Sequence, residues 1–378
     1  MKKDFFLMHK DIKVASFTFN DSLINFSNIT VYNQNHMPIG TQNPRGNDIS
    51  SALKKWLKNR CIPNDRPNIG ELLSTLHIND ILELLTMNCY FCSLTDCYWF
   101  KDINDNKMWN NVNFFSNGFD SNLGEILFFK DFSQPINNLH SPDITTNGAL
   151  PKFWYKDENE GHCLLKDGFR ENQVISQKQE VVAEIFAYEL FKKYNIKATP
   201  YFFVEIENCL CSSCPNFIKD DSMEFISMEN VSQDLGGSKK MAYKKFCELG
   251  LKEKMDEIVI LDFINGNGDR HHNNIGYIRN SNTLKIIGLA PCFDNGAGMS
   301  YDYTSGKAVE KAGAKLFYRD EIEELSLVDD FDYFKSSNIT YEELSDLYKE
   351  LSKDILKENV IEDVLKQFKN RYIFLKNK

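Results

Sequence analysis

The 378-residue chain carries 44 basic and 54 acidic side chains, giving a formal net charge of −10, and 42% of its residues are apolar. This length suffices for two or three domains with sizeable cores, and the composition excludes a disordered chain. The acidic balance argues against a general nucleic-acid binder, although a local basic groove stays open. No apolar run approaches the ~18 residues of a membrane span. The best stretch, EIVILDFI, is short and interrupted by Asp262.

The N-terminal segment and the cysteines indicate the compartment. The apolar part of MKKDFFLMHK is too brief for a signal peptide, so we expect a cytoplasmic protein. Ten cysteines in such a chain favour reduced thiols over a disulfide framework. Two clusters invite comparison with zinc sites, namely Cys89, Cys92 and Cys97, and the CxCxxC run of Cys209, Cys211 and Cys214. Neither has a second Cys or His pair at a suitable distance, so buried thiols are the expectation.

The first part of the chain predicts a mixed α/β region. Alternating apolar and polar residues over 12–35 predict a strand meander. Leu and Ile at three- and four-residue steps over 69–88 predict a helix. The stretch 101–143 is rich in Asn, Ser and Asp, which predicts a linker or a partly ordered insertion.

A lysine and a glutamate stand out in the next part. Residues 152–168 predict two strands around the turn DENEG, with Lys166 near the end of the second. A helix is predicted over 179–194. Glu184 lies at the edge of the apolar stripe of that helix, where it can point toward a packed sheet.

The rest of the chain predicts strands and then helices. Extended segments are predicted at 199–208, 215–218 and 223–229. From Lys239 the pattern becomes mainly helical, with one helix ending at Gly250 and the next spanning 252–264. The tail from Arg319 predicts three amphipathic helices, one of which begins at Thr340 with a capping box.

The densest polar cluster, NGNGDRHHNNIGYI, follows an apolar helix and leads through a predicted hairpin into the acidic loop APCFDNGAG. This order is expected to bring Asp269, Asn274 and Asp294 together. Their oxygen ligands suit Mg²⁺, and phosphoryl transfer uses one Asp to orient the hydroxyl and an Asp with an Asn to hold the metal. His271 lies two residues after Asp269, within reach of a transferring phosphate. The alternative is that these residues simply form turns.

These residues resemble a known family. GDRHHNN followed by LAPCFDNG is similar to the catalytic and metal-binding loops of the HipA-like serine/threonine kinases, over roughly Ser141 to the C-terminus. The pieces WLKNRCIPNDRP and CSLTDCYWF also resemble the leading region of Gram-positive members. GDRHxxN followed by DxG resembles phosphatidylinositol kinases as well. The loops therefore specify kinase chemistry better than they specify a substrate.

The resemblance implies a role for each matching residue. Asp269 would be the catalytic base, and Asn274 and Asp294 the Mg²⁺ ligands. Lys166 would contact the phosphates of ATP, paired with Glu184. For Lys166 the alternative is a solvated residue at a strand edge.

The segment SPDITTNGALPK occupies the family's phosphate-loop position, with neither a Walker loop nor a GxGxxG motif. The backbone near Gly148 and the hydroxyls of Thr145 and Thr146 would cradle phosphate. HipA-like kinases autophosphorylate in this loop, which makes Thr145 or Thr146 a candidate acceptor; a simple polar turn is the alternative. The adenine is expected near Phe217 and Ile218.

The resemblance implies an α+β, two-lobed protein-kinase-like fold with a mixed N-terminal lobe, a mainly helical C-terminal lobe and an N-terminal α/β extension. The expected divisions are 1–120, 121–235 and 236–378.

The expected function is transfer of the ATP γ-phosphate, with Mg²⁺, to a Ser or Thr of an unidentified protein substrate. A toxin-like role would bring a small helix-turn-helix antitoxin as partner. We expect no direct nucleic-acid binding, and no membrane binding because no basic amphipathic helix is present. A lipid or small-molecule kinase is one alternative. An ATP-binding pseudokinase is another, because Asn273 replaces the lysine that the family has before its metal-binding Asn.

Overall fold

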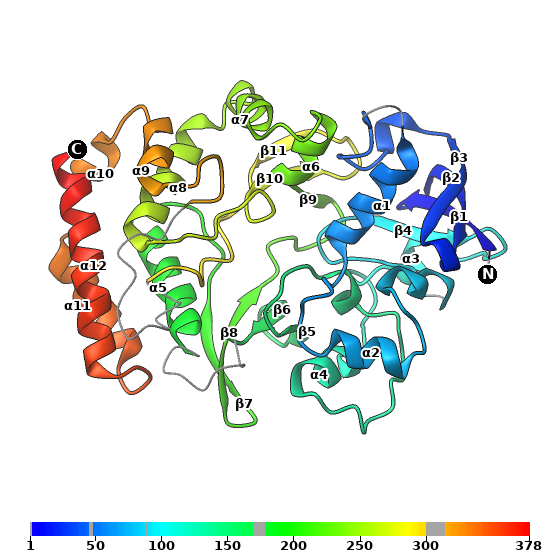
Figure 1. Cartoon of the computed structure of the whole chain (residues 1–378), viewed down its shortest axis with the longest axis horizontal. Coiled ribbons are helices and arrows are strands. Elements are labelled where there is room, and N and C mark those ends of the chain that lie inside the picture. The colour runs from blue at the N-terminus through cyan, green and yellow to red at the C-terminus, as the bar shows by residue number, and fades with distance from the viewer. Residues whose placement is uncertain (1, 45–47, 88, 169–177, 300–313) are drawn as a thin grey trace. The chain divides into compact units, whose positions relative to one another are not determined.

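A computed structural model describes residues 2–44, 48–87, 89–168, 178–299 and 314–378. The chain forms two compact units (Figure 1). The first unit comprises Met1–His162, Ile218–Ser238 and Tyr277–Ile287, and the second comprises Cys163–Phe217, Lys239–Gly276 and Gly288–Lys378.

The first unit is built on an antiparallel sheet of order β3-β2-β1-β4. Its strands are β1 (Lys2–His9), β2 (Ile12–Asn20), β3 (Asn25–Val31) and β4 (Tyr98–Asp102). The aromatic face of this sheet packs on α1 (Ile49–Arg60), where Trp56 contacts Phe100 and Phe100 contacts Phe17 edge to face. The predicted meander over 12–35 is confirmed, and β1 extends it toward the N-terminus.

Two expectations for the first unit were wrong. The segment 69–88 forms α2 (Ile69–Thr75) and a separate 3₁₀ helix, Ile81–Met87, because His77 adopts a left-handed φ of 54° that ends the first helix. The segment 101–143, predicted as a linker or a partly ordered insertion, is not a linker but part of the first unit. It contains α3 (Trp109–Val112) and α4 (Asn122–Phe129), and Trp109 and Phe128 are fully buried.

A second, three-stranded sheet in this part of the chain has the order β11-β10-β9. It contains β9 (Met223–Ser227) and the predicted hairpin of β10 (Gly276–Asn280) and β11 (Ile286–Leu289). The extended segment predicted over 223–229 ends at Ser227, because the hydroxyl of Ser227 accepts from the Asn230 N–H and caps α6 (Met228–Asp234). Glu224 is fully buried and accepts hydrogen bonds from Arg279 Nε and His9 Nε2, both at 2.8 Å.

The predicted strands at 152–157 and 161–166 form β5 (Lys152–Asp157) and β6 (Gly161–Lys166). In the second unit β6 pairs antiparallel with β8 (Cys209–Pro215), which pairs with β7 (Phe202–Ile206). The predicted helix forms as α5 (Gln179–Lys193) and packs its apolar stripe on this sheet. The segment predicted as extended at 215–218 contributes only Pro215 to a strand.

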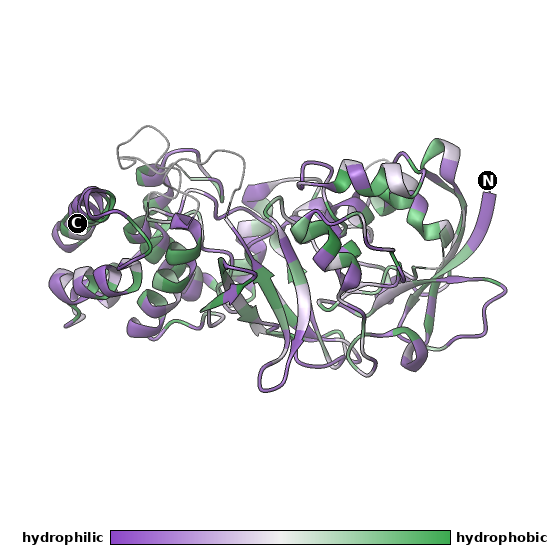
Figure 2. Cartoon of the chain, turned by 90° about the horizontal axis from the view of Figure 1, so that it is seen from below, coloured by the Kyte–Doolittle hydropathy of each residue, from purple (hydrophilic) through white to green (hydrophobic). Residues whose placement is uncertain are grey.

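Most of the other described residues of the second unit form helices. These are α7 (Lys239–Glu248), α8 (Lys252–Asn265), α9 (Glu321–Glu324), the 3₁₀ helix Leu325–Leu327, α10 (Asp332–Lys335), α11 (Tyr341–Ser352) and α12 (Glu358–Asn377). Phe186 of α5 packs edge to face against Tyr348 of α11 and Phe368 of α12. The helices near the C-terminus carry hydrophilic and hydrophobic residues side by side, as amphipathic helices do (Figure 2). The Thr340 hydroxyl caps α11 as predicted, 3.1 Å from the Glu343 N–H.

Within the described ranges, no helix combines the length and the apolar character that crossing a membrane requires.

The end of α8 is anchored by a buried arginine. Arg371 of α12 donates to the carbonyl of Phe263 at 3.0 Å and forms a two-pronged pair with Glu321 at 2.5 and 3.1 Å. Because Phe263 lies in the last turn of α8, this contact fixes the point at which the polar loop begins.

We expect Arg371→Met to lower the free energy of unfolding by about 3 kcal/mol or more, because it leaves the Glu321 carboxylate buried without its partner. The measurement is urea denaturation followed by circular dichroism. Lys366→Met, at an exposed position of the same helix, is the control and should change it by less than about 0.5 kcal/mol. Equal effects of the two substitutions would contradict the anchoring role.

Candidate active site

A buried lysine joins three elements of the second unit. Lys166, at the end of β6, has a side chain only 5% exposed. Its ammonium pairs with Glu184 of α5 and, at 2.5 Å, with the carboxylate of Asp294. Three residues that the sequence assigned to one site therefore meet at one point.

Electrostatics keep Lys166 charged. Burial by itself lowers the pKa of Lys166, but the carboxylates of Asp294 and Glu184 outweigh it and raise the pKa well above its usual value. The ammonium therefore stays protonated throughout the physiological range.

The acidic loop holds Asp294 in an uncommon backbone conformation. Its φ of 57° lies in the left-handed region, which residues other than glycine rarely adopt. The Asp294 N–H donates to the Tyr201 hydroxyl at 3.1 Å, and the Asn295 N–H donates to Glu184 at 2.8 Å. Strain of this kind persists where surrounding contacts enforce it, as at many functional sites.

The polar loop begins where α8 ends, at Gly266, whose φ of 67° suits a glycine C-cap. The Asn274 side chain donates to the carbonyl of Asp269 at 3.4 Å, which places both residues on one turn. His271 is partly exposed, and its Nε2 lies 3.9 Å from Asp269 Oδ2. The loop therefore presents a carboxylate and an imidazole side by side.

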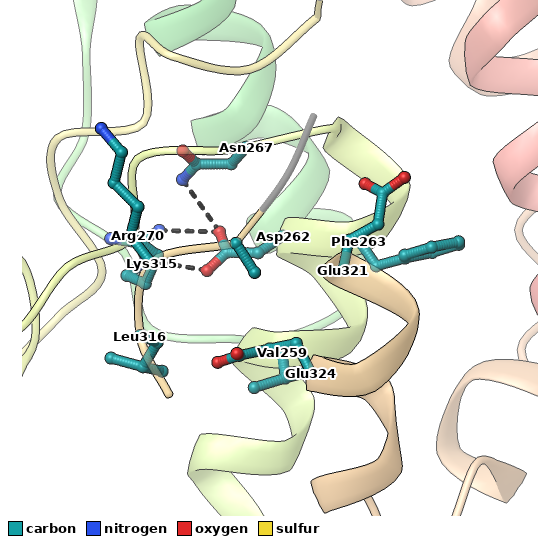
Figure 3. Close-up of a pocket in the computed structure, with 10 residues that line it drawn as sticks. Val259, Asp262, Phe263, Asn267, Arg270, Lys315, Leu316, Glu321 and Glu324 are labelled. Carbon is teal, nitrogen blue, oxygen red and sulfur yellow. Dashed lines mark hydrogen bonds and ion pairs between the residues drawn. The ribbon is translucent and has the colours of Figure 1, made fainter. Parts of the chain in front are cut away.

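Arg270 connects this loop to the acidic loop, a role that was not predicted from the sequence. Its guanidinium binds Asp262 of α8 through two hydrogen bonds of 2.8 and 2.9 Å (Figure 3). It also donates to the carbonyls of Asn274 at 3.2 Å and Phe293 at 2.8 Å, and to the Asn295 side chain. One buried cation thus ties the loop of Asp269 and Asn274 to the residues on both sides of Asp294.

Lys315, which is remote in sequence, contacts Asp269. Lys315 Nζ lies 2.5 Å from Asp269 Oδ1, and the Lys315 side chain is 58% exposed. Beside it lies a pocket whose polar lining includes Asn267, Arg270 and Glu324 (Figure 3). Burial raises the pKa of Glu324 to about 7, despite hydrogen bonds from the N–H groups of Tyr318 and Phe317.

The predicted phosphate-loop residues lie in the first unit. The hydroxyls of Thr145 and Thr146 donate to the carbonyls of Cys92 and Pro142 at 2.6 and 2.7 Å. Gly148 has a φ of 100°, which requires glycine. Arg66, which the sequence reading did not single out, donates to the carbonyl of Gly148 at 2.9 Å and also to that of Thr146.

The two residues predicted near the adenine fall on either side of the division between the units. Phe217 belongs to the second unit, where its ring centroid lies 5.3 Å from that of Phe293, the residue before Asp294. Ile218 is fully buried and belongs to the first unit.

A sequence signal existed for one missed contact. Asp262 interrupts the apolar run EIVILDFI, and a charge inside a buried helix needs a partner, which is Arg270. Lys315 lies 46 positions from Asp269, and no local pattern announces their contact.

The ligand set of the predicted metal site consists of oxygens. The carboxylate of Asp294 and the amide of Asn274 offer the hard oxygen donors that Mg²⁺ prefers. The carboxylate of Asp294 already faces a cation, the Lys166 ammonium. The donor chemistry of these residues therefore fits a magnesium ion.

The fold is similar to that of HipA in a complex of the Shewanella oneidensis MR-1 toxin–antitoxin system, HipA, HipB and operator DNA. The TM-score is 0.61 at 10% identity, with 99% of each chain covered. A proinflammatory kinase of Helicobacter pylori, CtkA, matches with a TM-score of 0.44 at 16% identity, covering 61% of this chain and 92% of that chain. No model of a known protein family and no curated protein matches the sequence. The chain has a HipA-like fold, mixed α/β with several antiparallel sheets, as the loop motifs implied.

We expect Arg270→Lys to lower the free energy of unfolding by about 2–4 kcal/mol, because an ammonium cannot replace a guanidinium that binds four acceptor groups. Thermal and urea denaturation measure the loss. Arg319→Lys makes the same chemical change at an exposed position and should be nearly silent. A stable Arg270→Lys variant would show that the two loops are held by other contacts.

Proposed function

We propose that this chain is an ATP-dependent phosphotransferase with a two-lobed, kinase-like arrangement, which transfers the γ-phosphate to a Ser or Thr of a protein substrate. The observation that carries the proposal is the convergence of Lys166, Glu184 and Asp294 from a strand, a helix and a loop. The HipA-like fold supports it. The divisions 1–120, 121–235 and 236–378 stay a prediction.

In this proposal Lys166 binds the phosphates of ATP and Glu184 holds its ammonium in place. The aromatic pair of Phe217 and Phe293 offers an apolar surface for the adenine. The placement of Ile218 near the adenine stays a prediction. The backbone near Gly148, with Thr145 and Thr146, would form the phosphate loop, and the two hydroxyls would have to leave the carbonyls of Cys92 and Pro142 to bind phosphate.

Asn274 and Asp294 would hold Mg²⁺, which neutralises charge on the nucleotide phosphates. If Asp294 held the metal, Lys166 would be free to contact phosphate oxygens in place of that carboxylate and would keep its pair with Glu184. The positive charge of Lys166 would stay neutralised, because phosphate oxygens would take the place of the Asp294 carboxylate.

Asp269 accepts the proton of the attacking hydroxyl, and His271 lies within reach of the phosphate. Asn273 lacks the positive charge that the family has at this position. We propose that Lys315 supplies it, because the Lys315 ammonium contacts the Asp269 carboxylate directly.

The biological role is proposed by analogy. The HipA of Shewanella oneidensis is in a complex with HipB and operator DNA. A toxin-like kinase with a small helix-turn-helix antitoxin as partner and with Thr145 or Thr146 as a self-modification site is the corresponding proposal for this chain.

Asp269→Asn is expected to lower phosphate incorporation from Mg²⁺-ATP by about 10²–10⁴-fold, because the general base is lost. ATP should still raise the melting temperature of this variant, since Lys166 and Asp294 are untouched. The measurements are mass spectrometry of the chain before and after ATP, and a melting scan. The control is Asp346→Asn, at a side chain that is 78% exposed.

The outcomes separate the possible functions. A rise in melting temperature without any phosphate transfer would indicate an ATP-binding pseudokinase. Transfer to phosphoinositide vesicles or to a small alcohol, but to no protein, would indicate the lipid or small-molecule class. If the unaltered chain neither binds ATP nor transfers phosphate, the proposal is refuted.

Lys315→Gln is expected to lower kcat by about tenfold or more with little change in KM for ATP, because the charge acts near the transferring phosphate. Lys315→Arg should restore much of the rate. Lys366→Gln, at an exposed site on α12, is the control. If Lys315→Gln has the same kcat as the unaltered chain, Lys315 does not replace the positive charge that is missing at Asn273.

A further inference from the structure

Asp167, Cys209 and Cys211 form a cluster on one face of the sheet in the second unit. Lys166 of β6 pairs with Ser212 of β8, and successive residues of a strand point to opposite faces. The residue after Lys166 and the odd-numbered residues of β8 therefore share a face. Cys214 lies on the other face, where it packs with Val181 and Ile185 of α5.

The distances between the ligand atoms fit a tetrahedral metal site. The Sγ atoms of Cys209 and Cys211 are 3.8 Å apart, and Cys209 Sγ lies 3.4 Å from Asp167 Oδ2. With Zn–S near 2.3 Å and Zn–O near 2.0 Å, a tetrahedron has an S–S edge of about 3.8 Å and an S–O edge of about 3.5 Å. All three ligand atoms lie within 4.8 Å of one another.

We propose that Asp167, Cys209 and Cys211 bind Zn²⁺ or another thiophilic divalent cation, as three protein ligands with one further coordination position. Thiolates select soft or borderline cations over Mg²⁺, so this site is chemically distinct from the one at Asn274 and Asp294. Binding replaces two S–H bonds by two S–metal bonds, and the two protons pass to solvent.

The surroundings orient the carboxylate and balance its charge. Asp167 Oδ1 accepts from Lys178 Nζ at 2.9 Å and from the Gly168 N–H at 2.8 Å, which directs Oδ2 toward Cys209. Lys178 also donates to the Leu210 carbonyl at 2.7 Å and lies 3.3 Å from Cys209 Sγ. Two thiolates and a carboxylate carry three negative charges, which a divalent cation and the Lys178 ammonium neutralise.

The test is a Co²⁺ titration of the full chain with its thiols reduced, because Co²⁺ bound by thiolates shows sulfur-to-metal charge transfer and tetrahedral d–d bands. We expect one equivalent to bind and Zn²⁺ to displace it. The absence of thiolate charge transfer in the unaltered chain would overturn the proposal without any variant.

Variants then locate the site. Cys211→Ser, Cys209→Ser and Asp167→Asn should each weaken Co²⁺ binding at least tenfold, and Lys178→Met about 10–100-fold. Cys214→Ala, on the same strand but the opposite face, should keep full binding. Circular dichroism shows whether each variant folds. Charge transfer that persists in folded Cys209→Ser and Cys211→Ser, or is lost in folded Cys214→Ala, would refute the assignment.

Discussion

The candidate site depends on the burial of one positive charge. Removing an ammonium from water costs several kcal/mol unless it is paired closely, and Lys166 is paired with two carboxylates. Those carboxylates come from α5 and from the acidic loop, so the lysine can be buried only when strand, helix and loop converge. Two carboxylates around one ammonium leave an excess negative charge, which makes the site attractive to a further cation.

The same principle holds for Arg270, a buried cation that is paired with Asp262. Its planar guanidinium presents donors in several directions, and the structure uses them on Asp262 of α8 and on carbonyls of two loops. A lysine offers a point charge and cannot join so many partners. The buried arginine therefore ties the loop of Asp269 to the loop of Asp294 through backbone carbonyls of Asn274 and Phe293.

The sequence predicted those parts that are encoded locally. The apolar period of α5, the hairpin of β10 and β11, and the polar loop after α8 were all read from spacing and turn residues. Contacts between remote segments were not, because periodicity carries no information about them; Lys315 beside Asp269 is the clearest case. Composition misled at 101–143, where many Asn, Ser and Asp residues suggested a linker. Trp109 and Phe128 are buried there, and a few large apolar side chains suffice to fix a polar segment.

The cysteines show why spacing alone misjudges a metal site. The linear motif CxCxxC suggests that all three thiols are ligands. On a strand, however, only residues an even number of positions apart share a face. In the proposed site Cys209 and Cys211 therefore act together and Cys214 does not. The third ligand is a carboxylate just beyond the end of the neighbouring strand, 42 positions away. That carboxylate belongs to the residue directly after Lys166. A cation bound there would restrain the end of β6 from one face while Glu184 and Asp294 hold the lysine from the other, so the two sites share one stretch of backbone.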